Sequence, residues 1–402
     1  MSRHRGWSPA SPHSFSRRGL LAGGGLAALG AALGACTRES GVAPDGARTL
    51  ESTIVEDRSA EIRRVRWANW DAYIDLDDAG ESPTLREFTD QTGLDVDYAA
   101  AVDDNDVFYE EIQPDLDARR DIGYDVVCFT DWAMSRLIRN GYCLELDEAN
   151  LPNKTNILPD LLAVDYDPGR IFSIPWQGGY AGLVWNVDEL PRGLATIEDL
   201  WRPELRGRVV VLSEMRDTIG LIMMSQGVDI SSPDWGDAQF DAARAVLEQQ
   251  LADGQVSQVR GNSYLDDLES GSALAAIAWS GDISSLNAEA GERWQWALPE
   301  SGGTLWFDTL AVPITSPAKA NAEILLNHYL DPQVAARVAA WVQFITPVAG
   351  AQEAMLGIDP DLAEDPLIFP TPEFLEQVRV FRALRPDEDA RYSEDFALAI
   401  GG

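Results

Sequence analysis

Four short segments place an aromatic side chain beside a carboxylate, a combination that suits the capture of an organic cation. They are Trp70-Asp71 with Tyr73 close behind, Thr130-Asp131-Trp132, Trp279 followed by Asp282, and Trp306 followed by Asp308. Aromatic faces attract ammonium groups, and each such contact contributes about 0.5–2 kcal/mol. A carboxylate adds a charge-assisted hydrogen bond to the same ammonium. Two acids separated by an aromatic channel would therefore suit a linear diamine or polyamine.

For any single tryptophan the alternative is a place in the hydrophobic core, and we expect Trp67, Trp185 and Trp341 to be core residues. Catalysis is not indicated, because the sequence contains no Gly-x-Ser-x-Gly, His-Glu-x-x-His or phosphate-binding loop motif. His328 is the one histidine beyond the N-terminal segment, and with two cysteines it cannot form a thiolate–imidazole metal site. We therefore expect no metal, no cofactor and no enzymatic activity.

The N-terminal segment has the features of an export signal. Arg17 and Arg18 precede an apolar, Ala- and Gly-rich run that ends at Leu33-Gly34-Ala35-Cys36. Small residues before a cysteine are typical of a lipoprotein processing site. The alternative is a transmembrane anchor, but the run is shorter than the ~20 residues that a spanning helix needs. We predict a twin-arginine lipoprotein signal peptide over 1–35, lipidation of Cys36 and a flexible tether over 36–60.

Export places the mature protein in the periplasm or at the outer face of the cytoplasmic membrane, where the lipid on Cys36 anchors it.

The chain is strongly acidic, with 66 Asp and Glu residues against 31 Lys and Arg residues and a formal net charge of −35. Such a field repels nucleic acid, and it favours cationic partners or a saline habitat. We expect a monomer that binds no nucleic acid and whose acids are mostly solvated.

Strand and helix patterns alternate from residue 62 onward, which predicts a mostly parallel sheet with helices on both faces. Predicted strands cover 62–67, 94–98, 124–129, 182–186, 209–212, 274–279 and 310–313, and predicted helices cover 84–92, 108–118, 132–140, 196–200, 237–253 and 318–340. The chain exceeds one typical core, so we expect two lobes with a crossing at 172–179. Ligands in such sheets bind at the carboxyl ends of strands, where Trp70 and Thr130 are expected.

Cys128 and Cys143 are the cysteines beyond the signal segment. Export to an oxidising compartment permits a disulfide between them. Cys128, at the end of a buried strand, fits a small core residue equally well. The sequence leaves both interpretations open.

Six segments carry a resemblance to a known family: Asn69-Trp70-x-x-Tyr73-Ile74, 124–127, 141–147, 173–176, 199–209 and 302–313. In this order and spacing, from about residue 64 to the C-terminal region, the chain resembles the polyamine-binding (spermidine/putrescine) proteins of ABC transporters. The resemblance implies a two-lobed periplasmic-binding-protein (type II) fold, in which each lobe is a mixed α/β sheet flanked by helices and a hinge joins the two. It implies lobe 1 at 61–176 and 308–350, and lobe 2 at 177–307 and 351–402.

The resemblance also implies the ligand contacts, in which aromatic side chains stack on the ligand and Asp308 holds an amine. Asp71 departs from the family, which usually has a small hydroxyl residue at that position. Glu214 stands where the family has an aspartate, and Asp217 stands where it has a glutamate. Asp282 occurs more in putrescine-type than in spermidine-type receptors. The expected ligand-binding residues are Trp70, Asp71, Tyr73, Thr130, Trp132, Glu214, Asp217, Trp279, Asp282, Trp306, Asp308 and Tyr392.

From these features we expect an extracytoplasmic lipoprotein that captures a polyamine, putrescine before spermidine, and delivers it to the permease subunits of an ABC importer. Three alternatives stay open. The protein could bind another amine solute, such as a quaternary amine or an amino-acid derivative. It could hand its ligand-bound form to a membrane sensor, or it could be a secreted hydrolase that uses two carboxylates.

Overall fold

The structure, a computed structural model, describes residues 55–401. The predicted signal peptide, the predicted lipidation site Cys36 and most of the predicted tether lie outside the described residues. Within the described part, no helix combines the length and the apolar character that crossing a membrane requires.

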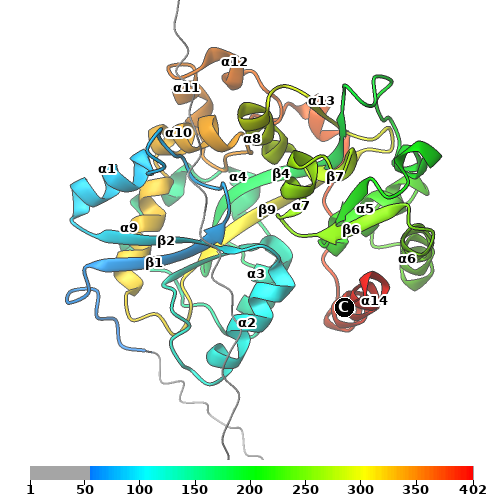
Figure 1. Cartoon of the computed structure of the whole chain (residues 1–402). Coiled ribbons are helices and arrows are strands. Elements are labelled where there is room, and N and C mark those ends of the chain that lie inside the picture. The colour runs from blue at the N-terminus through cyan, green and yellow to red at the C-terminus, as the bar shows by residue number, and fades with distance from the viewer. Residues whose placement is uncertain (1–54, 402) are drawn as a thin grey trace, which may run out of the picture. The chain divides into compact units, whose positions relative to one another are not determined.

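One mixed sheet of ten strands runs through residues 55–401 in the order β2-β1-β3-β9-β4-β7-β5-β6, with β10 paired to β9 and β8 paired to β4. Figure 1 shows β1 and β2 on one side of β9, and β6 and β7 on the other. The strands are β1 (Arg64–Trp70), β2 (Asp95–Val102), β3 (Val126–Thr130), β4 (Ser173–Asn186), β5 (Val209–Leu212), β6 (Val256–Arg260), β7 (Ala275–Trp279), β8 (Trp294–Ala297), β9 (Gly303–Ala311) and β10 (Val378–Arg379).

Helices connect most of the strands, and their ends follow local capping chemistry. Helix α1 begins after Ser82, whose side chain accepts a hydrogen bond from the backbone N–H of Leu85, and it ends at Gly93, where φ is 66°. The helices are α1 (Pro83–Thr92), α2 (Asn105–Asp117), α3 (Asp131–Arg139), α4 (Pro159–Leu162), α5 (Met215–Ser225), α6 (Asp237–Ala252), α7 (Tyr264–Glu269), α8 (Ser280–Ala290), α9 (Lys319–Tyr329), α10 (Pro332–Val342), α11 (Ala351–Met355), α12 (Pro360–Ala363), α13 (Pro372–Leu375) and α14 (Pro386–Ile400).

Strands β4 and β9 run through both halves of the sheet. Residues Ser173–Pro175 of β4 pair with the last residues of β9, whereas Ala181–Trp185 pair with β7. A register shift between Pro175 and Gln177 separates the two parts. The expected parallel pairing is present among β1, β2 and β3 and among β5, β6 and β7. The sheet is mixed because β4 and β9 run antiparallel to each other. Strand β4 is also antiparallel to β7 and β8, and β9 is antiparallel to β3 but parallel to β10.

Two large hydrophobic cores form on this sheet. The first contains side chains of β1, β3, α1, α2, α9 and α10, and the second contains side chains of β5, β7, α5, α6 and α14. Trp67 and Trp185 are core residues as expected, and Trp341 packs partly buried against the first core. Ala351 and Ile368 also lie in the first core, although the resemblance placed residues 351–402 in lobe 2.

Cys128 and Cys143 are free, buried thiols in the structure, so the candidate disulfide is absent. The sulfur of Cys143 lies 4.0 Å from the sulfur of Met134. Burial raises the pKa of both thiols well above the usual value, because a thiolate would lose its hydration inside the first core. Both cysteines therefore pack as small apolar side chains.

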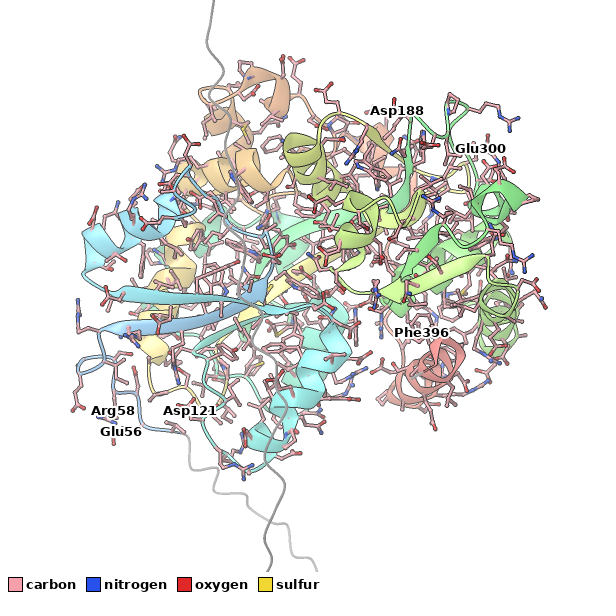
Figure 2. The ribbon with its side chains drawn as sticks, viewed as in Figure 1. Glu56, Arg58, Asp121, Asp188, Glu300 and Phe396 are labelled. Carbon is pink, nitrogen blue, oxygen red and sulfur yellow. The ribbon has the colours of Figure 1, made fainter. Side chains whose placement is uncertain are left out.

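The surface is rich in solvated acids, as the composition predicts. Glu56, Asp188 and Glu300 are exposed (Figure 2). Some surface acids pair with arginines, for example Glu61 with Arg58 at 2.9 Å. Such exposed pairs contribute at most about 1 kcal/mol each, so the surface charge itself mainly sets which partners approach.

Candidate ligand-binding site

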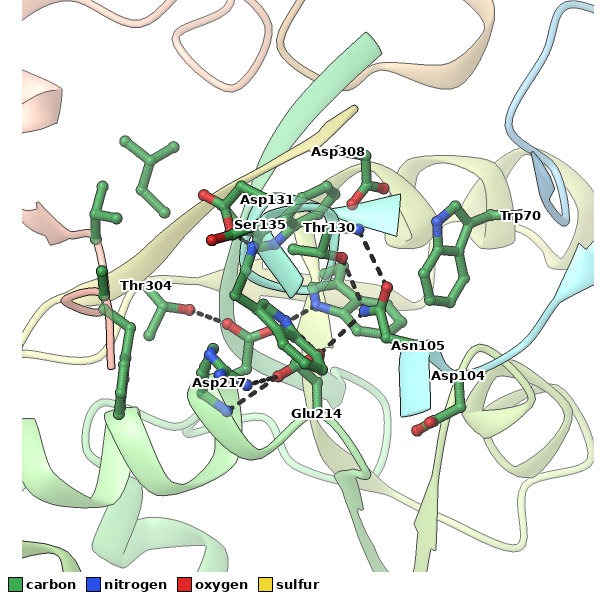
Figure 3. Close-up of a pocket in the computed structure, with 18 of the residues that line it drawn as sticks. Trp70, Asp104, Asn105, Thr130, Asp131, Ser135, Glu214, Asp217, Thr304 and Asp308 are labelled. Atoms are coloured by element: carbon green, nitrogen blue, oxygen red, sulfur yellow. Dashed lines mark hydrogen bonds and ion pairs between the residues drawn. The ribbon is translucent and has the colours of Figure 1, made fainter. Parts of the chain in front are cut away.

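A cavity with a volume of about 390 Å³ lies at the carboxyl ends of β1, β3, β5 and β7. The first turns of α3, α5 and α8 and part of β9 also line the cavity (Figure 3), as do residues 103–105, 163–166, 261–262 and 380–384, Phe344 and Asp389. The cavity therefore lies at the carboxyl ends of strands, where the sequence predicted a ligand. It brings together eleven of the twelve predicted residues: Trp70, Asp71, Tyr73, Thr130, Trp132, Glu214, Asp217, Trp279, Asp282, Trp306 and Asp308.

Tyr392 is the predicted residue that the structure places elsewhere. Its ring stacks on Phe240 with 4.1 Å between the ring centroids. Its hydroxyl donates a hydrogen bond to Asp237 Oδ1 at 2.7 Å. Helix α14 packs its apolar face against α6 in the second core, which turns Tyr392 into that core and away from the cavity lining. This finding corrects its expected place in the ligand set.

Five aromatic side chains, which we call the aromatic wall, form one continuous series beside the cavity. Ring centroids lie 6.4 Å apart for Trp70 and Trp279 and 6.3 Å apart for Trp279 and Trp306. The series continues from Trp306 to Phe344 at 5.6 Å and from Phe344 to Tyr73 at 5.3 Å. The rings meet edge to face, a geometry that contributes about 0.5–1.5 kcal/mol per pair beyond apolar burial.

Phe344 is a member of the aromatic wall that the sequence analysis missed. It follows α10 and reaches the wall because two glycines leave room for its ring. A Cβ atom at Gly281 would lie 2.7 Å from Phe344 Cδ2, and one at Gly179 would lie 2.8 Å from Phe344 Cδ1. The glycines in the runs Gly178-Gly179 and Ser280-Gly281 are thus the sequence signal that another side chain packs closely against the backbone there.

Asp308 lies at the centre of the sheet, with Thr130 of β3 on one side and Gln177 of β4 on the other. The residue is 3 % exposed, and its Oδ1 has no hydrogen-bond partner among the described residues. Burial raises the pKa of Asp308 to about 7, because the carboxylate loses its hydration there. The hydroxyl of Thr130 accepts a hydrogen bond from Asn105 at 2.9 Å.

Three further acids differ in the hydrogen bonds that their carboxylates accept from the protein. The hydroxyl of Tyr264 donates to Asp282 at 3.0 Å, and burial raises the pKa of Asp282 to about 7. Asp217 accepts hydrogen bonds from Thr304 Oγ1 at 2.5 Å (Figure 3) and from Trp279 Nε1 at 2.8 Å. Burial raises the pKa of Asp217 to about 6. Asp71 is exposed at the rim and accepts from the backbone N–H of Ala72.

Glu214 and Trp132 belong to a polar cluster at one end of the cavity. Glu214 Oε2 accepts hydrogen bonds from Trp132 Nε1 at 3.1 Å and from Asn105 Nδ2 at 3.2 Å. Burial raises the pKa of Glu214 to about 8. The Cζ atom of Arg216 lies 3.7 Å from the centroid of the Trp132 ring, and its guanidinium pairs with Asp389 at 2.8 Å. No motif in the sequence marked Arg216 or Asp389 as a cavity residue.

Residues 103–105, which we call the bridging segment, connect the two cores across the cavity mouth. The backbone N–H of Asn262 donates to the Asp103 carbonyl at 3.0 Å, and that of Ser263 donates to Asp103 Oδ1 at 3.0 Å. The hydroxyl of Ser213 donates to Asp104 Oδ2 at 2.5 Å. These contacts hold loops from the two sides of the sheet together, and no motif in the sequence marked them.

The family of bacterial extracellular solute-binding proteins matches residues 84–371 of this chain. The spermidine/putrescine-binding periplasmic protein of Escherichia coli is 25 % identical over 309 residues, which cover 77 % of this chain and 83 % of that protein. The putrescine-binding periplasmic protein SpuD of Pseudomonas aeruginosa is 26 % identical over 329 residues, which cover 78 % and 85 %.

A solved structure gives the same fold. The spermidine/putrescine ABC transporter substrate-binding protein of Streptococcus pneumoniae matches with a TM-score of 0.65 and 23 % identity, and the match covers 84 % of this chain and 98 % of that one. The predicted two-lobed type II periplasmic-binding-protein fold is thereby confirmed. Because the family match extends over most of the sequence, the chain belongs to the family of bacterial extracellular solute-binding proteins.

Proposed function

We propose that this protein captures a polyamine outside the cytoplasm, binds putrescine more tightly than spermidine, and delivers it to the permease subunits of an ABC importer. The twin-arginine segment and Cys36 support export and lipid anchoring, and we expect the protein to act as a monomer. The relatives named for spermidine or putrescine binding support an amine ligand. The protein holds its ligand without changing it chemically.

The observation that carries the proposal is the state of Asp308. A carboxylate that is 3 % exposed and leaves one oxygen without a hydrogen-bond donor is costly to ionise. A primary ammonium would supply both the missing donor and the opposite charge. The aromatic wall beside Asp308 would contact the same ammonium and the methylene groups next to it.

A second acid is available for the other end of a short diamine. Asp282 accepts one hydrogen bond, from Tyr264. It lies in the first turn of α8, the helix that begins directly after Trp279 of the aromatic wall. Asp217 already accepts two hydrogen bonds from the protein, so it has less capacity for a ligand amine. Asp308 and Asp282 are therefore the two carboxylates that we assign to the ligand.

Binding would close two lobes around the ligand. We propose residues 61–176 and 308–350 as lobe 1 and residues 177–307 as the larger part of lobe 2. Residues 351–402 would divide between the two, because their buried side chains pack first in one core and then in the other. Such a closure derives its energy from contacts that neither lobe makes alone.

Isothermal titration calorimetry with putrescine, cadaverine, spermidine, spermine and choline tests this function. We expect one site, putrescine as the tightest ligand and weaker binding at high salt, because the ligand charge is screened. The quaternary ammonium of choline cannot donate a hydrogen bond to Asp308, so tighter choline binding would favour the quaternary-amine alternative. Failure of every amine to bind, or chemical conversion of putrescine, would overturn the proposal.

A further inference from the structure

A cation that belongs to the protein occupies one end of the cavity. Arg216 lines the cavity, and the side chain is only 9 % exposed. Its Cζ atom lies 3.7 Å from the centroid of the Trp132 ring, which is the distance at which a bound ammonium would contact an indole. Its guanidinium also lies 3.8 Å from Glu214 Oε1. Arg216 therefore contacts both the aromatic face and the acid that a ligand amine would use at this end.

Two more arginines increase the positive charge there. Arg136 lies with its Cζ atom 4.9 Å from the same Trp132 centroid and pairs with Asp389 at 3.3 Å. Arg139 pairs with Asp389 at 3.6 Å. Asp389 is thus shared among three guanidiniums. Arg136 also pairs at 2.7 Å with Asp106, an acid that does not line the cavity.

Glu214, the acid beside both Trp132 and Arg216, is a poor partner for a further ammonium. Glu214 already accepts hydrogen bonds from Trp132 and Asn105. Burial raises the pKa of Glu214 to about 8, so that it carries a proton near neutral pH. A ligand nitrogen placed against the Trp132 ring would meet Arg216 there, and the two like charges would repel each other.

We propose that Arg216 is a specificity-determining residue that closes the Trp132 end of the cavity to a third ammonium group. The inference rests on the proposed function, because it concerns the length of the polyamine that the same site accepts. Asp308, Asp282 and the aromatic wall hold both amines of a diamine. The third nitrogen of a triamine would be directed to Arg216, which makes longer polyamines weaker ligands.

Arg216→Met is the direct test, since methionine keeps an unbranched apolar stem and removes the charge. Calorimetry gives the dissociation constants of putrescine and spermidine for each protein. We expect the ratio of the spermidine constant to the putrescine constant to fall about tenfold in R216M, through tighter spermidine binding. Arg216→Gln, which keeps hydrogen-bond donors for Asp389, should lower the ratio in the same direction.

Arg136→Met is the matched control. Arg136 contacts the same ring and the same carboxylate as Arg216 but does not line the cavity, so we expect a much smaller fall in the ratio than in R216M. An unchanged ratio in both folded Arg216 variants, or an equal fall in R136M, would overturn the role of Arg216. A wild-type protein that binds neither putrescine nor spermidine would instead overturn the proposed function.

Discussion

The carbonyl oxygen of Asp103 lies so close to Gly261 that a Cβ atom at residue 261 would be 2.1 Å from it. No real side chain tolerates that separation, so this close contact requires glycine. The neighbouring backbone N–H groups of Asn262 and Ser263 both donate to Asp103. The hydrogen bonds that hold the bridging segment to the side of the second core therefore depend on the absence of a Cβ atom at Gly261.

Gly261→Ala should separate the bridging segment from residues 261–263. We expect the dissociation rate of the bound amine to rise about tenfold, in line with the 1–3 kcal/mol that overpacking costs, while the association rate changes little. Stopped-flow fluorescence measures both rates. Gly357→Ala is the control, since its Cβ atom would meet nothing closer than 3.4 Å. An unchanged dissociation rate in G261A would contradict the importance of this contact.

Asp308→Asn should weaken diamine binding and stabilise the ligand-free protein at the same time. Loss of the counter-charge costs at least about 2 kcal/mol of binding free energy. The pKa of Asp308 is raised to about 7, so the native state holds this proton more tightly than the unfolded state. Stability therefore falls as pH rises from about 4 to about 7, and the amide removes that loss.

Calorimetry and thermal unfolding at pH 8 measure the two effects of D308N. Asp188→Asn is the matched control, because Asp188 is exposed at the surface. We expect neither the diamine affinity nor the unfolding temperature to change in D188N. Unchanged diamine affinity in D308N would remove Asp308 from the site.

Diamine affinity should increase as pH rises from 5.5 to 8. Burial raises the pKa of Asp308 and of Asp282 to about 7, so both carboxyls are largely protonated at the lower pH. An ammonium binds only the ionised form well, so binding releases protons. Titration in two buffers of different ionisation enthalpy reports the released protons directly. Constant affinity without proton release across this range would contradict the assignment.

Gly179→Ala should disturb the aromatic wall. A Cβ atom there would lie 2.7 Å from Trp306 Cζ2 and 2.8 Å from Phe344 Cδ1, so at least one ring must move. We expect a stability loss of about 1–3 kcal/mol and weaker binding of every amine rather than altered selectivity. Denaturant unfolding and calorimetry measure these effects, again with G357A for comparison. Wild-type stability in G179A would mean that the rings adapt without cost.

Cys128 and Cys143 should resist alkylation in the folded protein. Both thiols are buried, and burial holds the pKa of each far above neutral pH, so little reactive thiolate forms. Mass spectrometry after iodoacetamide treatment, with and without denaturant, identifies the modified residues. A reductant should leave the unfolding temperature unchanged. Detection of a peptide linked through both cysteines would contradict the structure.

Much of the candidate site could be predicted because strand ends have recognisable sequence patterns. Trp70, Thr130 and Trp279 each end a buried strand, and ligands of such sheets bind at the carboxyl ends of strands. Strands β1 and β3 reach the cavity from one side, and β5 and β7, which run in the opposite direction, reach it from the other side, with Asp217 and Asp282 on the helices that follow them. Short-range pattern therefore fixed both the location of the cavity and its chemical character.

The rest depended on long-range packing. Phe344 enters the aromatic wall only because Gly179 and Gly281, far away in sequence, leave space for it. Arg216 precedes an expected ligand residue, but its pairing with Asp389 depends on how α14 docks against the second core. The same docking turns Tyr392 inward, which is why a prediction from chain position failed there.

Strand β9 carries Trp306 and Asp308 on a backbone that pairs with β3 at one end and with β10 at the other. A substitution there that shifts the backbone alters more than solute choice, because the same peptide units tie the two cores together. Efforts to retune selectivity would therefore do better on α5 or α8, where side chains reach the cavity from elements outside this shared strand.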